Sequence, residues 1–310
     1  PIQIRVGLNS GEVVVGAIGN DLKMDYTAVG QTVHLASRME QMATPGSVVM
    51  TADTLRLAEG FVQVKLFGPV AVKGMSEPVE VYEVTGAGIA RTRLQAAAAR
   101  GLSQFVGRDA ETEQLRKALE QTRAGHGQVV AVVGEPGVGK SRLFYEFTRS
   151  HRTEGCLIVE SGSVSYGKAT PYLPVIDLLK AYFKIHDRDS QRDVREKVTG
   201  KLLTLDKTLE PALPALLSLL DVPQDDPQWQ NLDPSQRRQR TLDAIKGLLL
   251  RESQVQPVVL VFEDLHWIDS ETQSFLDGLI DSLPTALLLL LANYRPEYRH
   301  GWGSKTYYSQ

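Results

Sequence analysis

The feature that most constrains the fold of this chain is one segment that matches the pattern G-x-x-x-x-G-K-[ST]. The segment consists of Gly134, Glu135, Pro136, Gly137, Val138, Gly139, Lys140 and Ser141. The apolar run Val129–Val133 precedes it, and residues with helical spacing begin at Ser141. Glycines let the backbone curl so that successive N–H groups converge on phosphate oxygens, and a helix N-terminus adds positive potential. The pattern therefore predicts a phosphate-binding loop; a glycine-rich turn with a chance lysine is the alternative.

A pair of acidic residues further along the chain completes the predicted site. The apolar run Val258–Phe262 ends in Glu263 and Asp264, and such a run places carboxylates at the carboxyl edge of a parallel sheet, where ligands bind. Lys140 would reach the β- and γ-phosphates, and Ser141 would ligate Mg²⁺. One acid would also hold Mg²⁺, through water, and the other would orient the attacking water. Their order leaves the two roles open, and two solvated loop acids are the alternative.

Strand and helix patterns alternate over residues 103–310, which predicts βαβ units and an α/β P-loop domain with a parallel sheet. The predicted strands are Val129–Val133, Leu157–Glu160, Val258–Phe262 and Ala286–Ala292. The predicted helices are Glu111–Thr122, Ser141–Arg149, Pro174–Phe183, Arg237–Leu250 and Glu271–Ser282. The segment Asp187–Gln230 has helical pieces and several prolines, and the pattern gives it no assignment.

Residues 1–86 mix strand and helix patterns, which predicts an α+β domain. Ile4–Gly19 is interpreted as a strand hairpin and Gln31–Met42 as a helix. The other predicted elements are a strand at Ser47–Thr51, a helix at Ala52–Glu59, and strands at Phe61–Phe67, Val70–Lys73 and Val79–Val84. Residues 87–102 include a stretch rich in Ala, Arg and Leu, which is typical of a helical linker.

Composition and charge narrow the classes of function. The formal net charge is −3 at pH 7, so we expect no bulk attraction to nucleic acid or to a membrane surface. The most apolar run, Ala286–Ala292, is far below the ~20 residues of a membrane-spanning helix. The single cysteine, Cys156, excludes an internal disulfide and fits a cytoplasmic protein. The N-terminus lacks a signal-peptide pattern, and both ends are interpreted as cuts in a longer chain.

Several motifs between residues 103 and 300 resemble those of the AAA/STAND-type ATPases of bacterial signalling proteins. These motifs are Val106–Glu111, the segment 134–141, Ser165–Gly167 with Pro171 and Tyr172, Glu263–Trp267 and Tyr294–Glu297. The resemblance implies that ATP is the ligand and that Arg295 occupies the sensor position near the γ-phosphate. It also implies that the segment Val106–Arg108 lies beside the adenine. A surface arginine is the alternative for Arg295. In such ATPases the nucleotide state moves a lid or helical domain, which would lie beyond Gln310.

Residues 1–86 resemble the C-terminal half of the class III adenylate/guanylate cyclase catalytic domain, which implies a ferredoxin-like fold. The matching segments are Ile4–Gly19, Tyr26–Glu40, Val72–Gly74 and Val79–Val84, in the order of the family. The resemblance implies that Thr27 reads the purine and favours adenine over guanine. It also implies that Arg38 stabilises charge on the phosphates and that Lys73 contacts the triphosphate. The alternatives are that Thr27 is an ordinary threonine of a strand, that Arg38 lies on a solvated helix face, and that Lys73 is a turn residue.

Two departures from the cyclase pattern bear on activity. His34 stands where the family's helix carries an asparagine that holds the ribose, so His34 would have to take over that contact. The family's two metal-binding aspartates would lie upstream of Pro1, and without Mg²⁺ the 3′-oxygen is not activated. We therefore expect no cyclic AMP from this chain alone. A class III site forms between two halves, so a homodimer or a second cyclase domain is the expected partner.

Three functions follow from these patterns. In the first, a longer protein is an adenylate cyclase whose output is tuned by a P-loop ATPase, with Mg²⁺ as cofactor. In the second, the cyclase-like domain is degenerate, and the ATPase acts as a switch or scaffold for protein partners bound outside this chain. In the third, the protein is a transcriptional regulator of the same ATPase class. The cyclase-like half argues against the third, because such regulators usually lack it.

Overall fold

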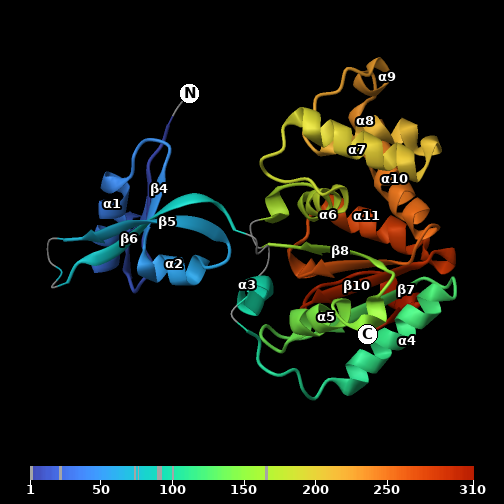
Figure 1. Ribbon diagram of the computed structural model, residues 1–310, viewed down its shortest axis with the longest axis horizontal. Coiled ribbons are helices and arrows are strands. Elements are labelled where there is room, and N and C mark those ends of the chain that lie inside the picture. The colour runs from blue at the N-terminus through green and yellow to red at the C-terminus, as the bar shows by residue number, and fades with distance from the viewer. Residues whose placement is uncertain are drawn as a thin grey trace. The chain divides into compact units, whose positions relative to one another are not determined.

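The molecule, a computed structural model, divides into two units, Pro1–Gln104 and Phe105–Gln310 (Figure 1). The structure describes residues 3–20, 23–72, 75, 77–88, 93–99, 101–164 and 167–310, without the side chains of 15–20, 23–29, 93 and 99. Helix α3 (Arg93–Ala99) is the element described in the region of the predicted linker. The domain limits drawn from the sequence, with a linker at 87–102, stay a prediction.

Five parallel strands form one sheet in the Phe105–Gln310 unit, in the order β11-β7-β10-β9-β8. They are β7 (Gln128–Val133), β8 (Leu157–Gly162), β9 (Val258–Glu263), β10 (Leu288–Tyr294) and β11 (Tyr308–Ser309). Every residue of β10 is buried, as expected for a central strand that is covered on both faces. The predicted parallel sheet is confirmed, and β11 has no counterpart among the predicted strands.

Helices cover both faces of this sheet because successive strand residues point to opposite faces (Figure 1). Val259 and Val261 of β9 pack against α4 and α5, whereas Leu260 and Phe262 face the core that contains α6 and α11. The helices are α4 (Asp109–Arg123), α5 (Lys140–Thr148), α6 (Leu173–Phe183) and α11 (Ser270–Ile280). The segment between β7 and α5 therefore lies at the carboxyl edge of the sheet, where β9 also ends.

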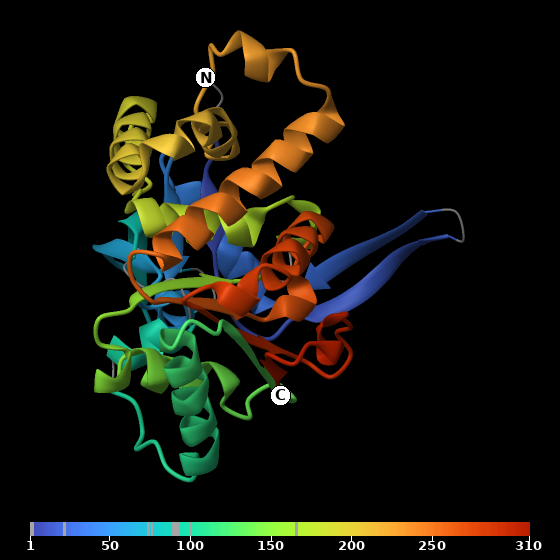
Figure 2. The ribbon, with the colours of Figure 1, turned by 90° about the vertical axis from the view of Figure 1, so that its right-hand side faces the viewer.

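Between α6 and β9 the chain builds a further layer of helices, which Figure 2 shows above the sheet. They are α7 (Gln191–Leu205), α8 (Leu213–Leu219), α9 (Pro227–Gln230) and α10 (Pro234–Ser253). Leu202, Leu216 and Leu248 are fully buried in the core that this layer shares with the sheet. Ser190 and Asp233 form capping boxes at the starts of α7 and α10, which satisfy backbone N–H groups of the first turn.

Short 3-10 turns connect the longer elements of the unit. They are η1 (His151–Thr153), η2 (Gly167–Ala169), η3 (Lys207–Ala212), η4 (Leu265–Trp267), η5 (Leu283–Thr285) and η6 (Trp302–Ser304). In the part of the chain that the structure describes, no helix combines the length and the apolar character needed to cross a bilayer.

In the Pro1–Gln104 unit, a mixed four-stranded sheet in the order β1-β4-β6-β5 lies with the helices α1 and α2. The elements are β1 (Val6–Leu8), α1 (Gln31–Met42), β4 (Val48–Thr51), α2 (Ala52–Ala58), β5 (Val62–Val70) and β6 (Val79–Ala87). Two further strands, β2 (Val14–Asn20) and β3 (Lys23–Val29), pair with each other as a projecting antiparallel ribbon (Figure 2). Gly7 lets α1 lie directly on β1, because a Cβ there would come within 2.0 Å of the Glu40 nitrogen. The ferredoxin-like assignment stays a prediction.

The hairpin expected at Ile4–Gly19 is wrong, because β1 and β2 belong to different sheets. β1 pairs in parallel with β4, and β2 pairs with β3. Asn9 accounts for the difference, since its side-chain amide donates to the carbonyl oxygen of Thr32 at 3.0 Å. It also accepts a hydrogen bond from the Thr51 hydroxyl at 2.7 Å. These two contacts tie the segment after β1 to α1 and β4 in place of a hairpin turn.

The two strands expected at Phe61–Phe67 and Val70–Lys73 are also wrong as separate elements. A single strand, β5, runs from Val62 to Val70 and pairs with β6 along that length. Its register shifts between Leu66 and Gly68, and Gly68 has a positive φ of 120°. This irregularity absorbs the Gly-Pro pair that the sequence pattern treated as a turn.

Candidate functional site

The segment 134–141, called the phosphate loop below, joins β7 to α5 in a conformation that depends on glycine. Gly137 and Gly139 have positive φ angles of 83° and 92°, where a side chain would be strained. Gly139 is the N-cap of α5, so the unpaired N–H groups of the first helical turn open toward the loop. The backbone N–H of Gly134 donates to the carbonyl oxygen of Tyr294 at 3.3 Å, which fixes the start of the loop to β10. This geometry suits an anion.

Lys140, the first residue of α5, is buried with 9% of its surface exposed. Its Nζ donates hydrogen bonds to the carbonyl oxygens of Gly134 at 2.7 Å and Glu135 at 3.0 Å. Within the described ranges it forms no ion pair with a carboxylate. Burial of a charge that is held only by carbonyl dipoles is costly. The ammonium group is therefore placed where an anionic ligand of the loop would stabilise it.

Glu263, at the end of β9, meets Ser141 of α5. The side chain of Ser141 lies near the Glu263 carboxyl group and acts on its pKa. Burial raises the pKa of Glu263 above its ordinary value, while the side chains of Ser141 and Asn293 act to lower it. The structure thus brings together two of the three predicted Mg²⁺ ligands. In the ranges that the structure describes, no group of three or more His, Cys, Asp or Glu side chains is placed to hold a metal ion.

Asn293 is a candidate site residue that the sequence analysis missed. It is fully buried in β10, and its Nδ2 donates to Glu263 Oε2 at 3.3 Å. Its Oδ1 accepts a hydrogen bond from the backbone N–H of Asp264 at 2.8 Å. Asn293 therefore orients both the buried carboxylate and the turn that follows β9. An amide side chain inside the apolar strand Leu288–Tyr294 was the available signal, because a buried amide needs partners.

The turn after β9 is strained and carries a buried histidine. Asp264 adopts a left-handed conformation with φ of 58°, which is uncommon for a residue with a side chain. Burial lowers the pKa of His266; the charges of Asp264 and Glu297 act to raise it, and those of Arg295 and Lys140 act to lower it. His266 thus lies within electrostatic reach of the phosphate loop and of the residues that follow β9 and β10.

Arg295 is the first residue after β10, and its side chain is about one-third exposed, at 34%. Its guanidinium group lies 3.9 Å from the Glu297 carboxylate and 5.7 Å from the centre of the Trp267 ring. The Lys168 amine lies 5.3 Å from the centre of the same ring. Because β9 and β10 are neighbours, Arg295 lies at the same sheet edge as Glu263. A contact between Arg295 and a γ-phosphate stays a prediction.

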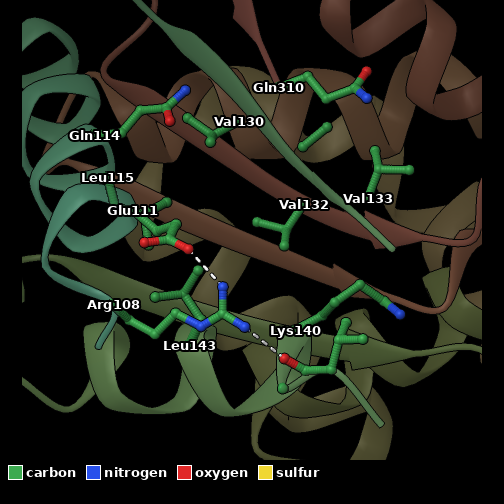
Figure 3. A pocket seen from close by; sticks show the side chains of 13 residues that line it. Arg108, Glu111, Gln114, Leu115, Val130, Val132, Val133, Lys140, Leu143 and Gln310 are labelled. Carbon is green, nitrogen blue, oxygen red and sulfur yellow. Dashed lines mark hydrogen bonds and ion pairs between the residues drawn. The ribbon is translucent and has the colours of Figure 1, made fainter. Parts of the chain in front are cut away.

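A cavity of about 370 Å³ lies beside the phosphate loop, between α4, β7 and α5 (Figure 3). Arg108 lines this cavity: one guanidinium nitrogen lies 2.5 Å from the Glu111 carboxylate, and another donates to the Val138 carbonyl at 2.8 Å. Gly139, Lys140 and Gln310 also line the cavity. Arg108 therefore connects the start of α4 to the phosphate loop, at the place where the sequence predicts the adenine.

The predicted cyclase residues belong to the other unit. His34 and Arg38 are exposed and lie four positions apart on α1, so they share one face of the helix. Arg38 donates to the side-chain oxygen of Gln41 at 3.0 Å. Thr27 pairs with Gly16 in the backbone of the β2–β3 ribbon, but its side chain lies outside the described residues, as does all of Lys73.

Two family models match the chain. The model of the AAA ATPase domain matches residues 104–291, which is more than half of the chain. The model of the adenylate and guanylate cyclase catalytic domain matches residues 1–86. The two families are those that the sequence motifs resemble, so both recognitions are confirmed.

Two curated relatives align with both parts of this chain, and a third aligns with about a quarter of it. An uncharacterized protein of Rhizobium meliloti is 24% identical over 301 residues, which cover 97% of this chain and 29% of that protein. Adenylate cyclase type 10 of Mus musculus is 22% identical, covering 94% of this chain and 18% of that protein. Adenylate cyclase 1 of Rhizobium meliloti is 34% identical over 84 residues, covering 26% and 13%. The chain thus spans less than a third of the length of these relatives.

Solved structures match about a quarter of the chain. The adenylyl cyclase CyaB from P. aeruginosa has 40% sequence identity over 26% of this chain and 41% of that chain, with a TM-score of 0.24. The guanylyl cyclase Cya2 has 36% identity over 28% and 45%, with a TM-score of 0.26. Each of these two similarities covers less than a third of the chain.

Proposed function

We propose that this chain, which belongs to the AAA ATPase domain family, binds ATP with Mg²⁺ at the phosphate loop and hydrolyses it. The observation that carries the proposal is the buried Lys140 amine, held by loop carbonyls beside the Ser141–Glu263 pair. The backbone N–H groups of the loop would bind the phosphates. The ammonium group of Lys140 would exchange its carbonyl contacts for phosphate oxygens, which compensate its charge fully.

Ser141 and Glu263 fit a Mg²⁺ ion by their chemistry. Mg²⁺ in nucleotide sites takes one or two protein oxygens together with phosphate oxygens and waters. A hydroxyl and a carboxylate that lie close to each other supply two such oxygens in one place. Burial raises the pKa of Glu263, so a cation would relieve the cost of its negative charge. When bound, the ion would neutralise charge that develops on the phosphates.

The same geometry supports a division of roles between the two acids. Glu263 faces Ser141 and Asn293, so we assign the Mg²⁺ contact to Glu263. Asp264, whose backbone is fixed by Asn293, would orient the attacking water. Arg295, at the same sheet edge, would stabilise negative charge on the γ-phosphate in the transition state.

Isothermal titration of the chain with Mg²⁺ and ATP tests the binding proposal. We expect Lys140→Ala to abolish ATP binding, because the loop then lacks the cation that faces the phosphates. Lys117→Ala is the matched control, since Lys117 is an exposed lysine of α4 that pairs with Glu113 at 3.9 Å. An ATP affinity of Lys140→Ala equal to that of the unaltered chain would refute the proposed site.

We further propose that the longer protein converts ATP to cyclic AMP. Residues 1–86 match the cyclase family, and relatives named adenylate cyclase align with most of the chain. Arg38 and His34 would act from one face of α1, with Thr27 on the purine and Lys73 on the triphosphate. A product assay on the longer protein with Mg²⁺ or Mn²⁺ tests this. Equal cyclic AMP formation by the unaltered protein and by Arg38→Ala would remove Arg38 from the mechanism.

The alternative is an ATPase switch or scaffold with a non-catalytic cyclase-like domain. The observation that favours it is His34, which stands where the cyclase family carries asparagine. The same assays separate the two functions. ATP binding at the phosphate loop without cyclic AMP from the longer protein supports the switch, whereas cyclic AMP that disappears in Arg38→Ala supports the cyclase.

A further inference from the structure

His266 is buried without the contacts that a buried polar side chain requires. Its exposed fraction is 8%, and neither ring nitrogen has a hydrogen-bond partner in the part of the chain that the structure describes. Buried side-chain nitrogens and oxygens without a partner cost folding free energy, so native structures contain few of them. An imidazole kept in this position at such a cost points to a ligand that supplies the missing hydrogen bond.

The place of His266 indicates which ligand that is. It lies in η4, two residues after Asp264, and the charges that act on it include Lys140 of the phosphate loop and Arg295 after β10. The hydroxyl of Ser163, the residue after β8, is a second buried group at this sheet edge that has no partner in the described residues. The backbone N–H of Ser163 donates to the carbonyl oxygen of Glu263 at 2.9 Å, which fixes it beside the end of β9.

The cavity beside Arg108 lies toward α4, and His266 is not among the residues that line it. A nucleotide whose base entered that cavity would extend its phosphates across the phosphate loop toward Lys140 and Glu263. His266 lies instead on the turn that follows Glu263, at the carboxyl edge of the sheet. Its missing partner is therefore a group at the phosphate end of the nucleotide.

We propose that His266 donates a hydrogen bond to the terminal phosphate of ATP bound at the phosphate loop, and thereby distinguishes ATP from ADP. This inference rests on the proposed function, because it requires a nucleotide in that loop. Trp267 holds the histidine from one side, with ring centres 5.1 Å apart at 46°. A ring fixed in this way presents its N–H in one direction, and ADP has no terminal phosphate there to receive it.

Titration of the 310-residue chain with Mg²⁺ and either AMP-PNP or ADP tests this inference. In His266→Leu we expect the affinity for AMP-PNP to fall about tenfold, as for one hydrogen bond to a charged group, with ADP affinity unchanged within about twofold. His266→Gln keeps an N–H donor and should recover part of the AMP-PNP affinity. Thermal denaturation supplies a second readout, because leucine removes two unpaired nitrogens and should keep or raise the melting temperature.

Thr122→Val is the matched control. The Thr122 hydroxyl is also buried without a partner in the described residues, but it lies at the end of α4 that leads into the start of β7, away from the phosphate loop. We expect it to leave both affinities unchanged.

Three outcomes would overturn the inference. If His266→Leu still binds ADP and has the same ratio of AMP-PNP affinity to ADP affinity as the unaltered chain, the role proposed for His266 is refuted, and the proposed function is not. A lower melting temperature with both affinities reduced equally shows a structural role. No binding of either nucleotide by the unaltered chain overturns the proposed function as well.

Discussion

At the scale of single residues, Glu263 is a buried acid whose position costs stability. Burial raises its pKa above the ordinary value of 4.5. Below pH 4.5 the carboxyl is protonated in the folded and unfolded chain alike, so it imposes no penalty. As pH rises above that value the unfolded chain releases the proton more readily, and folding stability is lost up to the raised pKa. The acid therefore opposes folding at neutral pH and is retained for what it binds.

We expect Glu263→Gln to raise thermal stability and to lower ATP hydrolysis. The glutamine oxygen still accepts the hydrogen bond of Asn293, but no charge is buried. The gain in melting temperature over the unaltered chain should be near zero at about pH 4 and largest at about pH 8. Hydrolysis should fall about tenfold or more, because the Mg²⁺ contact is lost. Differential scanning calorimetry and a phosphate-release assay measure the two effects.

The control for this substitution is Glu154→Gln, at an exposed residue of the turn before β8. It should leave both the stability profile and the rate of hydrolysis unchanged. A gain for Glu263→Gln that does not vary with pH would contradict the buried-charge argument.

At the scale of elements, two glycines have opposite requirements. Gly139 joins the phosphate loop to α5 with φ of 92°, so Gly139→Ala should destabilise the chain by about 1–2 kcal/mol and weaken nucleotide binding.

Gly200 lies inside α7, where an added Cβ would meet no atom within 4 Å. Gly200→Ala should stabilise the chain by about 0.5–1 kcal/mol. Urea denaturation of both variants tests the pair; a Gly139→Ala chain as stable as the unaltered one would refute the loop geometry.

The sequence predicts the elements that carry strong local signals. β9 and α5 are clear from apolar runs, helical spacing and the glycine pattern. α8 and α9 are not, because prolines look like breaks in a pattern, whereas Pro214 and Pro227 lie in the first turns of these helices. α10 is predicted at Arg237–Leu250, and the observed helix begins earlier, with Pro234 in its first turn. The two-residue strand β11 leaves no periodicity to detect.

The residues of the candidate site also fall into those that the sequence predicts and those that only the structure reveals. Lys140 and Glu263 follow from motifs, because spacing along the chain defines them. Asn293 and the unpaired His266 do not, because their roles depend on contacts between neighbouring strand ends and on burial. Such contacts exist only once the order of strands in the sheet is known.

At the scale of the whole molecule, the two units contain cores of very different size. In the described residues of the Pro1–Gln104 unit, one cluster of buried apolar side chains joins Met39, Ala43, Val49 and Val81. The Phe105–Gln310 unit buries both faces of its sheet in two far larger clusters. Because apolar burial is the main stabilising contribution, we expect two unfolding transitions, with the Pro1–Gln104 unit unfolding first.

Nucleotide identifies which transition belongs to which unit. A ligand that binds only the folded form raises the melting temperature of the unit that holds its site. AMP-PNP with Mg²⁺ should therefore raise the upper transition and leave the lower one in place. In Lys140→Ala the upper transition should no longer respond, which excludes a general effect of the nucleotide. Calorimetry could instead show that AMP-PNP raises the lower transition and leaves the upper one in place. This result would contradict the prediction, because it would mean that the Pro1–Gln104 unit binds the nucleotide more tightly than the phosphate loop does.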